Sequence, residues 1–398
     1  MCAEIPKGFV SVGFDSHKKQ HTMAIRGPDG WPVGQKVEIK NTKADFQLAR
    51  DLINDAKTKT GAQGVRIGIE AASFYHLPLV SEMAPYHEDT RVYNPKLMGG
   101  RPRREVRQKK NDHKDADKIA LAVRENVPGS MPYDNLPLME IQELCRFLSR
   151  MLKDRTNLKK RYLRNLHVLF PGYDELVGEV FESCRTRMLS KYPSAETVRK
   201  ANIQELQEAT QRNGRWGMRK KTIESIVELA NSVPDCPYYR EALLIEQEMQ
   251  LKRIRTLDNQ IGKVSARISS KWRDMGVHPK YFQIEGLNPK YAISLYTEVR
   301  DLTRFPTVDK FVGFLGLDPW TKRSDKKVTY GRLTKMGSRY AREALGNAVG
   351  SMQNTNSAIG DCWKRAKERG RKSKECRVIC MRKLARMMWG IENYQKNG

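Results

Sequence analysis

Residues 9–15, FVSVGFD, alternate apolar and small side chains and end on a carboxylate. This alternation is typical of a β-strand. Two further strands are expected at Thr22–Ile25 and Trp31–Ile39, separated by the turn sequence GPDG at 27–30. The N-terminal segment therefore predicts a three-stranded meander.

The next segment alternates helices and strands. The patterns predict a helix over Ala44–Lys57, a strand over Val65–Glu70, a helix near Leu77–Met83 and a last strand over Thr90–Tyr93. A meander followed by alternating strands and helices is the order of a ribonuclease H-like (RuvC-like) α/β fold. We expect that fold class for the N-terminal part of the chain.

Four carboxylates occupy positions that this fold would bring together. Asp15 closes the first strand, Glu70 closes the fourth, and Asp112 and Asp115 lead a segment of helical pattern. Open α/β sheets bind ligands at the carboxyl ends of their strands, and clustered carboxylates need raised pKa values or bound cations. Two Mg²⁺ ions meet that need in phosphoryl transfer. A strand-ending turn or a helix-leading acid remains the structural alternative at each position.

The chain is strongly basic, with 73 Lys and Arg against 46 Asp and Glu and a net charge of +27. This excess indicates a polyanionic partner, most simply nucleic acid, with a membrane surface as the rival. The cations expected to contact nucleic acid lie before the paired aspartates and in a C-terminal basic stretch. They are Arg101, Arg103, Arg104, Arg107, Lys109, Lys110, Lys322, Arg323, Lys326, Lys327, Arg332 and Lys335.

The location expected from the sequence is cytoplasmic, and nucleoid-associated when the protein is active. No apolar run approaches the roughly 20 residues that a membrane-spanning helix needs. The N-terminus, MCAEIPKG, lacks the apolar core of a signal peptide.

Two apolar stripes of helical spacing predict a pair of long helices. One stripe runs from Leu138 to Leu169 and the other from Leu257 to Ile268. Such stripes form an antiparallel coiled-coil arm or a dimer seam, and a buried domain helix has a similar stripe. The predicted domains are 1–130, an arm at 131–275 with a helical insert at about 171–237, and a mainly helical part at 276–398.

The C-terminal part is expected to begin with a helix-turn-helix hairpin at Phe282–Arg300, whose turn at 286–289 exposes backbone N–H groups to a phosphate. After a helix ending at Gly316, a long basic loop from Pro319 carries Ser324. Helices at Arg339–Val349 and Cys376–Asn393 follow. On its residue type alone, Ser324 is an ordinary turn or solvent residue.

Assembled, these residues resemble the IS one-ten family of insertion-sequence transposases, which are bridge-RNA-guided DNA recombinases. The resemblance covers nearly the whole chain. It rests on Gly13-Phe14-Asp15, Ile69-Glu70-Ala71, Val92-Tyr93-Asn94-Pro95, NDHKDA at 111–116, Leu315-Gly316-Leu317 with Pro319, Ser324, Gly331 with Gly337, and MRKLA at 381–385.

The resemblance implies a RuvC-like domain whose Asp-Glu-Asp-Asp set falls on Asp15, Glu70, Asp112 and Asp115, and a C-terminal serine nucleophile at Ser324. It also implies two Mg²⁺ ions per acidic site, a non-coding bridge RNA, and target and donor DNA. Family members assemble as tetramers, or dimers of dimers, in which the acidic site of one protomer meets the serine of another.

One acid has no counterpart in the family pattern, and two residues differ from it. Asp117 has no family role and is expected to be a surface acid. Asp325 follows Ser324 where relatives carry glycine, so it would place a like charge beside a bound phosphate. Asn288 stands where many relatives have the second glycine of Gly-x-Gly, and asparagine is the next best residue for a left-handed turn.

Three functions are open at this point. The first is an RNA-guided recombinase that acts through Ser324. The second is a metal-dependent nuclease or junction resolvase that uses the acidic set and water. The third is a nucleic-acid-binding protein without activity. A covalent adduct with DNA separates the first two, and loss of cleavage without Mg²⁺ separates both from the third.

Overall fold

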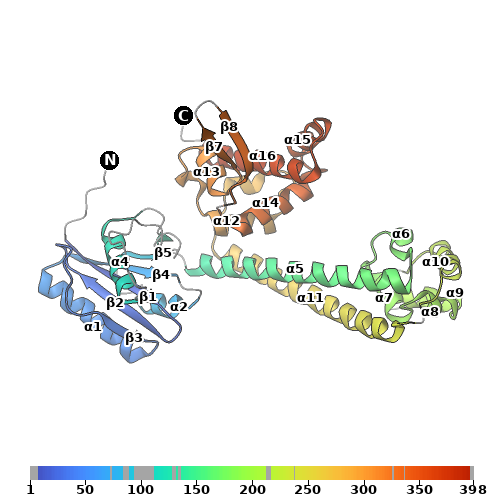
Figure 1. The fold of residues 1–398 in the computed structure, drawn as a ribbon, viewed down its shortest axis with the longest axis horizontal. Helices are drawn as coiled ribbons and strands as arrows, with labels where there is room; N and C mark the ends of the chain where they lie inside the picture. The colour runs from blue at the N-terminus through green and yellow to red at the C-terminus, as the bar shows by residue number, and fades with distance from the viewer. Residues whose placement is uncertain are drawn as a thin grey trace. The chain divides into compact units, whose positions relative to one another are not determined.

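The structure is a computed structural model, and it describes residues 8–71, 74–83, 89–93, 112–127, 131–132, 136–211, 217–236, 238–324, 327–335 and 337–394. The chain divides into two compact units, Met1–Leu136 and Pro137–Gly398 (Figure 1). Each unit is described by itself.

Unit 1 is built on a mixed sheet with the strand order β3-β2-β1-β4-β5-β6. Its strands are β1 (Phe9–Ser16), β2 (Gln20–Arg26), β3 (Val37–Lys40), β4 (Gly64–Glu70), β5 (Asp89–Tyr93) and β6 (Met131–Pro132). Strands β1, β2 and β3 form an antiparallel meander, β4 and β5 run parallel to β1, and β6 returns antiparallel to β5. The order of the predicted meander and of the two strands after it is confirmed.

In the described part of unit 1, the helices α1 (Lys43–Thr60), α2 (His76–Met83) and α4 (Asp112–Arg124) pack with this sheet. Helix α1 begins where the Thr42 side chain accepts a hydrogen bond from the backbone of Asp45, and it ends at Gly61 in the left-handed region. These are the preferred cap residues for the two ends of a helix.

Two predicted strands differ from the structure. The third strand is limited to Val37–Lys40, because Pro32 has no N–H to donate and Gly34 has a positive φ of 73°. Pro32 keeps only an isolated bridge to Arg26. Strand β5 is not the last strand, because the two-residue β6 pairs with it at Arg91 and Val92. So short a strand carries no alternation that a sequence pattern could reveal.

Unit 2 begins with two long antiparallel helices, α5 (Leu136–Leu169) and α11 (Arg240–Asp274). Lys271 near the end of α11 pairs with Glu140 near the start of α5, at 2.6 Å. Arg155 pairs with Asp258 at 2.8 Å. The apolar stripes of both helices are buried in a shared core. Of the arrangements that the sequence left open, the antiparallel pair within one chain is the one observed.

Between α5 and α11, the described residues form five short helices. They are α6 (Tyr173–Val177), α7 (Ser183–Lys191), α8 (Ala195–Arg199), α9 (Ile203–Thr210) and α10 (Lys220–Ser232). Their apolar side chains enclose Tyr162, Phe170 and Tyr173 in a core that also contains Leu251 and Ile254 of α11. The predicted helical insert is therefore a small core of its own at the end of the helix pair.

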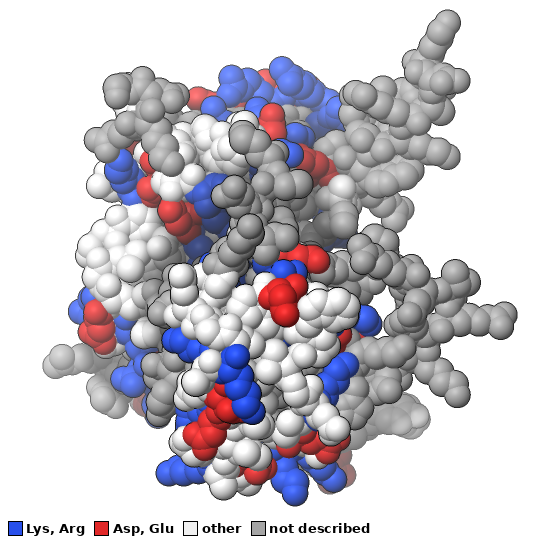
Figure 2. All heavy atoms as spheres, turned by 90° about the vertical axis from the view of Figure 1, so that its left-hand side faces the viewer, with Lys and Arg blue, Asp and Glu red and all other residues white. Residues whose placement is uncertain are grey.

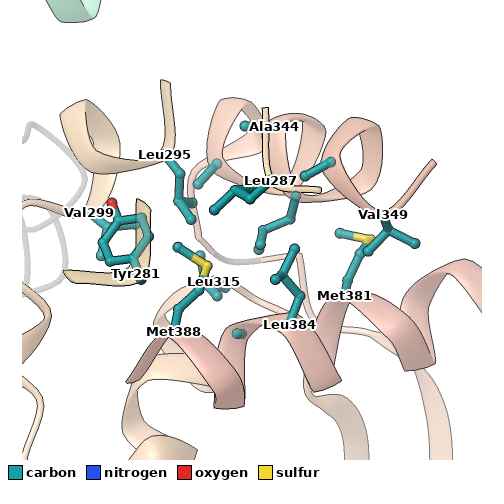
Figure 3. Close-up of a cluster of buried hydrophobic side chains, with 14 of the residues drawn as sticks. Tyr281, Leu287, Leu295, Val299, Leu315, Ala344, Val349, Met381, Leu384 and Met388 are labelled. Atoms are coloured by element: carbon teal, nitrogen blue, oxygen red, sulfur yellow. The ribbon is translucent and has the colours of Figure 1, made fainter. Parts of the chain in front are cut away.

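The rest of unit 2 packs around the last helix. Its elements are the 3-10 turns η2 (Lys280–Gln283) and η3 (Leu302–Arg304), helices α12 (Pro289–Val299), α13 (Val308–Phe314), α14 (Arg339–Met352), α15 (Ser357–Glu368) and α16 (Ser373–Asn393), and strands β7 (Pro319–Ser324) and β8 (Lys327–Leu333). Figure 3 shows Leu384 and Met388 of α16 in the core that contains Leu295 and Leu315, with Met381 beside Val349 of α14. Among the described residues, no helix combines the length and apolar character needed to cross a bilayer.

Two C-terminal predictions need correction. The basic segment after Pro319 is not a loop, because β7 and β8 pair as an antiparallel hairpin. The predicted hairpin at Phe282–Arg300 has only the short η2 before α12. Asn288 is not left-handed, with φ −64° and ψ 128°, and its side chain caps α12 by accepting from the backbone of Lys290.

Candidate active site

Asp15 and Glu70 leave the sheet at the same edge. Strands β1 and β4 pair in parallel, with Phe14 opposite Ile69. The two carboxylate residues directly follow this pair, on neighbouring strands about 4.8 Å apart. The Ser16 hydroxyl donates to the Glu70 backbone carbonyl at 2.6 Å and ties the two strand ends together. The structure thus brings two of the four predicted acids side by side at the carboxyl edge.

Helix α4 lies unusually close to these strands because glycines face it. A Cβ at Gly13 of β1 would lie 2.1 Å from the Ala116 carbonyl oxygen and 2.4 Å from the Ala120 nitrogen. A Cβ at Gly68 of β4 would lie 2.8 Å from methyl groups of both Ile119 and Val123. Glycine in a strand interior permits such a close backbone approach. The two glycines therefore allow α4 to pack closely against β1 and β4.

The direction of α4 follows from its other contacts. Arg124, its last residue, donates to the Pro28 carbonyl at 3.2 Å, beyond the end of β2. Arg26 at that end of β2 pairs with Ser11, near the start of β1. The C-terminal end of α4 therefore lies toward the amino end of β1. Its first turn, with Asp112 and Asp115, points toward the carboxyl edge where Asp15 and Glu70 lie.

The acids differ in their described surroundings. Asp15 is 6% exposed, and its Oδ2 lies 3.3 Å from Nε2 of His17. Asp115 is half-buried and accepts from Lys118 at 2.7 Å. Asp112 is the first residue of α4, and its side chain lies outside the described part of the structure. Within the described residues, no three Asp, Glu, His or Cys side chains form a cluster that could hold a metal ion.

The donor chemistry of the acidic set fits a divalent metal of the magnesium type. All four predicted ligands offer carboxylate oxygens, which are the donors that hard cations such as Mg²⁺ prefer. Two of them come from a rigid sheet edge and two from the first turn of a helix that glycines hold in place. Asp15, Glu70, Asp112 and Asp115 therefore stay the predicted ligands of such an ion.

The predicted nucleic-acid contacts are only partly described. Arg101, Arg103, Arg104, Arg107, Lys109, Lys110 and Lys326 lie outside the described residues. Lys322, Arg323, Lys327 and Arg332 lie on β7 and β8, of whose side chains the structure gives no account. Lys335 is exposed, with a positive φ of 53° that is uncommon for a side-chain-bearing residue.

Ser324 is the last residue of β7, where it pairs with Lys327 of β8. The structure therefore places the predicted nucleophile at the end of a strand, next to the two residues that join β7 to β8. The side chain of Ser324 is outside the described part of the chain, as is Asp325.

Sequence reasoning missed several residues that shape the acidic site. His17 next to Asp15 was one of them, and an imidazole two residues beyond a candidate ligand was the available signal. Gly13 and Gly68 were others, and a glycine inside a strand pattern was their signal. Asp117 is not a free surface acid, because Arg26 donates to both its carboxylate oxygens, at 2.8 and 2.6 Å.

Comparison with known families adds two matches. A model of DEDD transposases of the IS110 type matches residues 12–171. A second model, described as transposase of the IS116/IS110/IS902 family, matches residues 281–364. Together they cover more than half of the chain, including Asp15, Glu70, Asp112, Asp115 and Ser324. A search of curated proteins found no match.

The mixed α/β sheet, its acidic edge and these matches define a transposase, an enzyme that cleaves and joins DNA. The DEDD match indicates that its chemistry depends on divalent metal ions. More particularly, the chain belongs to the IS110 family of insertion-sequence transposases.

Proposed function

We propose that this transposase is a bridge-RNA-guided DNA recombinase in which Asp15, Glu70, Asp112 and Asp115 hold Mg²⁺ and Ser324 is the nucleophile. The observation that carries the proposal is the meeting of Asp15 and Glu70 at one sheet edge, with the first turn of α4 aimed at the same edge. The unit that contains them then has a ribonuclease H-like fold, as its strand order supports.

The covalent step would begin with the Ser324 hydroxyl. Its oxygen attacks the phosphorus of a phosphodiester and gives up its proton, while the bond to the leaving strand breaks and that strand's oxygen takes a proton. The bond energy is kept in a phosphoserine ester, which a hydroxyl of the incoming strand later displaces. Bound Mg²⁺ would supply charge stabilisation at the phosphate and lower the pKa of the attacking hydroxyl.

The described residues of unit 1 would support this chemistry in two ways. The Gly13 and Gly68 contacts fix the backbone of α4 relative to β1 and β4, which supports a site that is preorganised before substrate arrives. Asp15 is almost fully buried, which removes water from its surroundings and strengthens its attraction for a cation.

Guidance by RNA is supported by the net charge of the chain. A net charge of +27 suits the grip of nucleic-acid backbones. Where RNA pairing reads the target sequence, the protein needs to recognise only backbone and duplex shape. The partners in this proposal are a non-coding bridge RNA, target DNA and donor DNA, with the protein nucleoid-associated when active.

The proposal includes a domain plan and an assembly. The domains are a DEDD domain at 1–130, an arm at 131–275 and a serine-bearing domain at 276–398. The assembly is a dimer of dimers in which the acidic set of one protomer serves Ser324 of another.

The test of the acidic set is charge removal at constant volume. Asp15→Asn, Glu70→Gln, Asp112→Asn and Asp115→Asn should each abolish Mg²⁺-dependent strand cleavage while RNA and DNA binding persist. Asp51→Asn, at an exposed position of α1, is the matched control and should cleave like the wild type. Wild-type cleavage by Asp112→Asn would overturn the assignment. Cleavage without any protein–DNA adduct would favour a water-using nuclease instead.

A further inference from the structure

The end of α15, the connection after it and the start of α16 form a dense basic surface at residues 364–377, which we call the α15–α16 turn. Residues 364–377 contain eight Lys or Arg and two Glu. Six of the cations, all exposed, are Lys364, Arg365, Arg369, Arg371, Lys374 and Arg377. Neither the sequence-based site nor the family match at 281–364 extends across this turn.

Among the described residues, these six cations form no ion pair of the kind that neutralises cations elsewhere. Lys59 of α1 pairs with Asp55, Lys200 beside α8 pairs with Glu196, and Lys252 of α11 pairs with Glu248. Within the described part of the chain, no carboxylate lies within ion-pair distance of the six cations. On the described part of the face in Figure 2, by comparison, Lys and Arg are interspersed with Asp and Glu. The α15–α16 turn therefore carries an uncompensated positive field.

The backbone of the turn is fixed by both helix ends. Gly370, with φ 72°, ends α15, and the N–H of Arg371 donates to the Ala366 carbonyl at 3.1 Å. Helix α16 begins with a capping box in which the Glu375 carboxylate accepts from the Lys372 backbone at 3.2 Å. One of the two acids of the segment is thus used to cap the helix. The cations are held on a preorganised scaffold, which lowers the entropy cost of binding.

The inner faces of both helices are anchored in the core of unit 2. Ile359 of α15 and Cys380 and Leu384 of α16 are fully buried. The core that they join also contains Leu345 and Val349 of α14, the helix that follows β8. The α15–α16 turn is therefore anchored in the same hydrophobic core as α14, the helix that follows strand β8.

The side chains of the turn suit a duplex backbone better than single strands. Single-stranded nucleic acid is held by aromatic side chains on which bases stack. Residues 364–377 contain no aromatic side chain, and Trp363, which directly precedes them, is half-buried and packs against the core. A surface of Lys and Arg without a stacking ring is suited to contact the phosphates of a duplex.

We propose that the α15–α16 turn binds the phosphate backbone of double-stranded DNA. The choice of DNA rests on the proposed function, since this transposase acts on DNA and the turn shares a core with α14. The contacts are independent of DNA sequence, so they position the duplex on unit 2 and leave target choice to other parts of the complex.

The test is the salt dependence of DNA binding by the full-length protein as purified. The turn variant combines Arg369→Gln, Arg371→Gln, Lys374→Gln and Arg377→Gln. If all four residues contact phosphates, the plot of log affinity against log salt should be less steep by about 3 to 4 units, with at least a tenfold loss of affinity near 0.1 M salt. Affinity is measured on a 30-bp DNA duplex and a 20-bp RNA duplex in EDTA, so that cleavage plays no part.

A charge-matched control removes four lysines of unit 1, with Lys40→Gln, Lys43→Gln, Lys57→Gln and Lys59→Gln. The proposal expects this control to keep the wild-type salt slope on DNA. An equal loss in both variants would show an effect of net charge alone and would overturn the proposal, as would an unchanged slope in the turn variant. A loss confined to the RNA duplex would show that the surface serves RNA.

This outcome is separable from that of the proposed function. Binding in EDTA requires neither the acidic set nor Ser324. If the wild-type protein does not cleave DNA, yet the turn variant has a less steep salt dependence, the binding surface is supported and the recombinase proposal is refuted. If the wild-type protein cleaves DNA and the turn variant has an unchanged salt slope, the recombinase proposal stands and the binding surface is refuted.

Discussion

Gly13 of β1 lies so close to Ala116 of α4 that a methyl group at position 13 would sit 2.1 Å from the Ala116 carbonyl oxygen. Asp15 follows Gly13 by two residues, and Asp115 immediately precedes Ala116. Because both acids flank this one contact, the separation of strand and helix at Gly13 sets where the first turn of α4 stands relative to the sheet edge.

Gly13→Ala should therefore damage both the fold of unit 1 and its activity. The added Cβ meets backbone atoms, which cannot rotate away, so α4 must move off the strand. We expect a loss of about 3 kcal/mol in the free energy of unfolding, at the upper end of overpacking effects. Mg²⁺-dependent cleavage should fall by at least tenfold. Urea unfolding and a cleavage assay measure the two effects.

Gly262→Ala is the control for this substitution. Gly262 lies within α11, and a Cβ there would meet nothing within 4 Å. Alanine should stabilise the helix by about 0.5 to 1 kcal/mol, since it loses less backbone entropy than glycine. If Gly13→Ala proved as stable and as active as the wild type, the close packing of α4 against β1 would have no role in the site.

The second prediction concerns Asp117, which sequence reasoning treated as a silent surface acid. Its ion pair with Arg26 is bidentate, and the two side chains are only 22% and 15% exposed. Asp117→Asn should lower the free energy of unfolding by about 1 to 2 kcal/mol, between the values for exposed and buried pairs. Asp55→Asn, which breaks an exposed pair with Lys59, should cost no more than about 0.5 kcal/mol. Cleavage by folded Asp117→Asn should stay at the wild-type level.

The third prediction concerns Glu298 of α12, whose side chain is 3% exposed. It accepts two hydrogen bonds from Arg146 of α5, at 2.6 and 3.0 Å, and one from the hydroxyl of Ser338, at 2.7 Å. Although burial opposes the charged guanidinium, the bonds to Glu298 raise the pKa of Arg146 above its usual value. Glu298→Gln removes the charge that this guanidinium needs.

We expect Glu298→Gln to lower the free energy of unfolding of unit 2 by about 3 kcal/mol, because it leaves Arg146 without its counter-ion. Glu143→Gln breaks the more exposed pair with Arg150 and should cost less than about 1 kcal/mol. Chemical unfolding followed by tryptophan fluorescence compares the two variants. Equal stabilities would mean that the buried network contributes nothing to joining α5 and α12.

The fourth prediction is a pH dependence that comes from His21. This residue is fully buried in β2, and its Nε2 lies 2.7 Å from Oδ1 of Asn41, which can only accept. Burial lowers the pKa of His21 from its ordinary value of 6.5. Above pH 6.5 both folded and unfolded chains carry a neutral imidazole, and its stabilising contacts are fully present. Below it, the unfolded chain binds a proton that the folded chain does not, so stability falls.

His21→Gln should remove this component. The difference in unfolding free energy between wild type and His21→Gln should be constant above pH 6.5 and should shrink as the pH falls below it. For one group the slope cannot exceed about 1.4 kcal/mol per pH unit. Urea titrations from pH 7.5 downward measure the difference, and parallel curves for the two proteins would refute the role of His21.

The strands of unit 1 and the order of its acids were predictable because alternation and strand-ending carboxylates are local signals. Asp15 and Glu70 could be placed at the same edge of the sheet from the order of strands and helices. The close packing of α4 against Gly13 was not predictable, because a sequence shows the glycine but not the helix residue opposite it. The pairing of Asp117 with Arg26 spans 91 positions and has no local signature.

The hairpin of β7 and β8 was missed for a different reason. Its strands carry Lys322, Arg323 and Lys327, Lys326 lies between them in the sequence, and dense charge is typical of solvated loops. The ladder between Thr321–Ser324 and Lys327–Tyr330 forms nonetheless, because pairing between strands uses backbone N–H and C=O groups, which charged residues also carry. Thr321, Val328 and Thr329 are β-branched and were the available signal.

Ser324 closes β7 and pairs with Lys327, so the hairpin holds its backbone while cations flank it in sequence at Arg323 and Lys326. Flanking cations can neutralise the phosphate under attack, whereas Asp325 opposes it by like charge. Replacing Asp325 with the glycine of relatives should therefore raise the rate of adduct formation several-fold, and single-turnover trapping measures it. A slower rate in Asp325→Gly would mean that the carboxylate assists the reaction.

The last prediction is that Ser324 is the point of covalent attachment. Ser324→Ala removes the hydroxyl and should abolish the protein–DNA adduct while leaving assembly and nucleic-acid binding intact. Thr321→Ala removes the other hydroxyl of β7 and should leave the adduct in place. If the acidic set of one protomer serves the serine of another, mixing Ser324→Ala with Asp15→Asn should restore activity that neither has alone. Peptide mapping of protein trapped on DNA decides the assignment, since attachment at another residue would show that Ser324 is not the nucleophile.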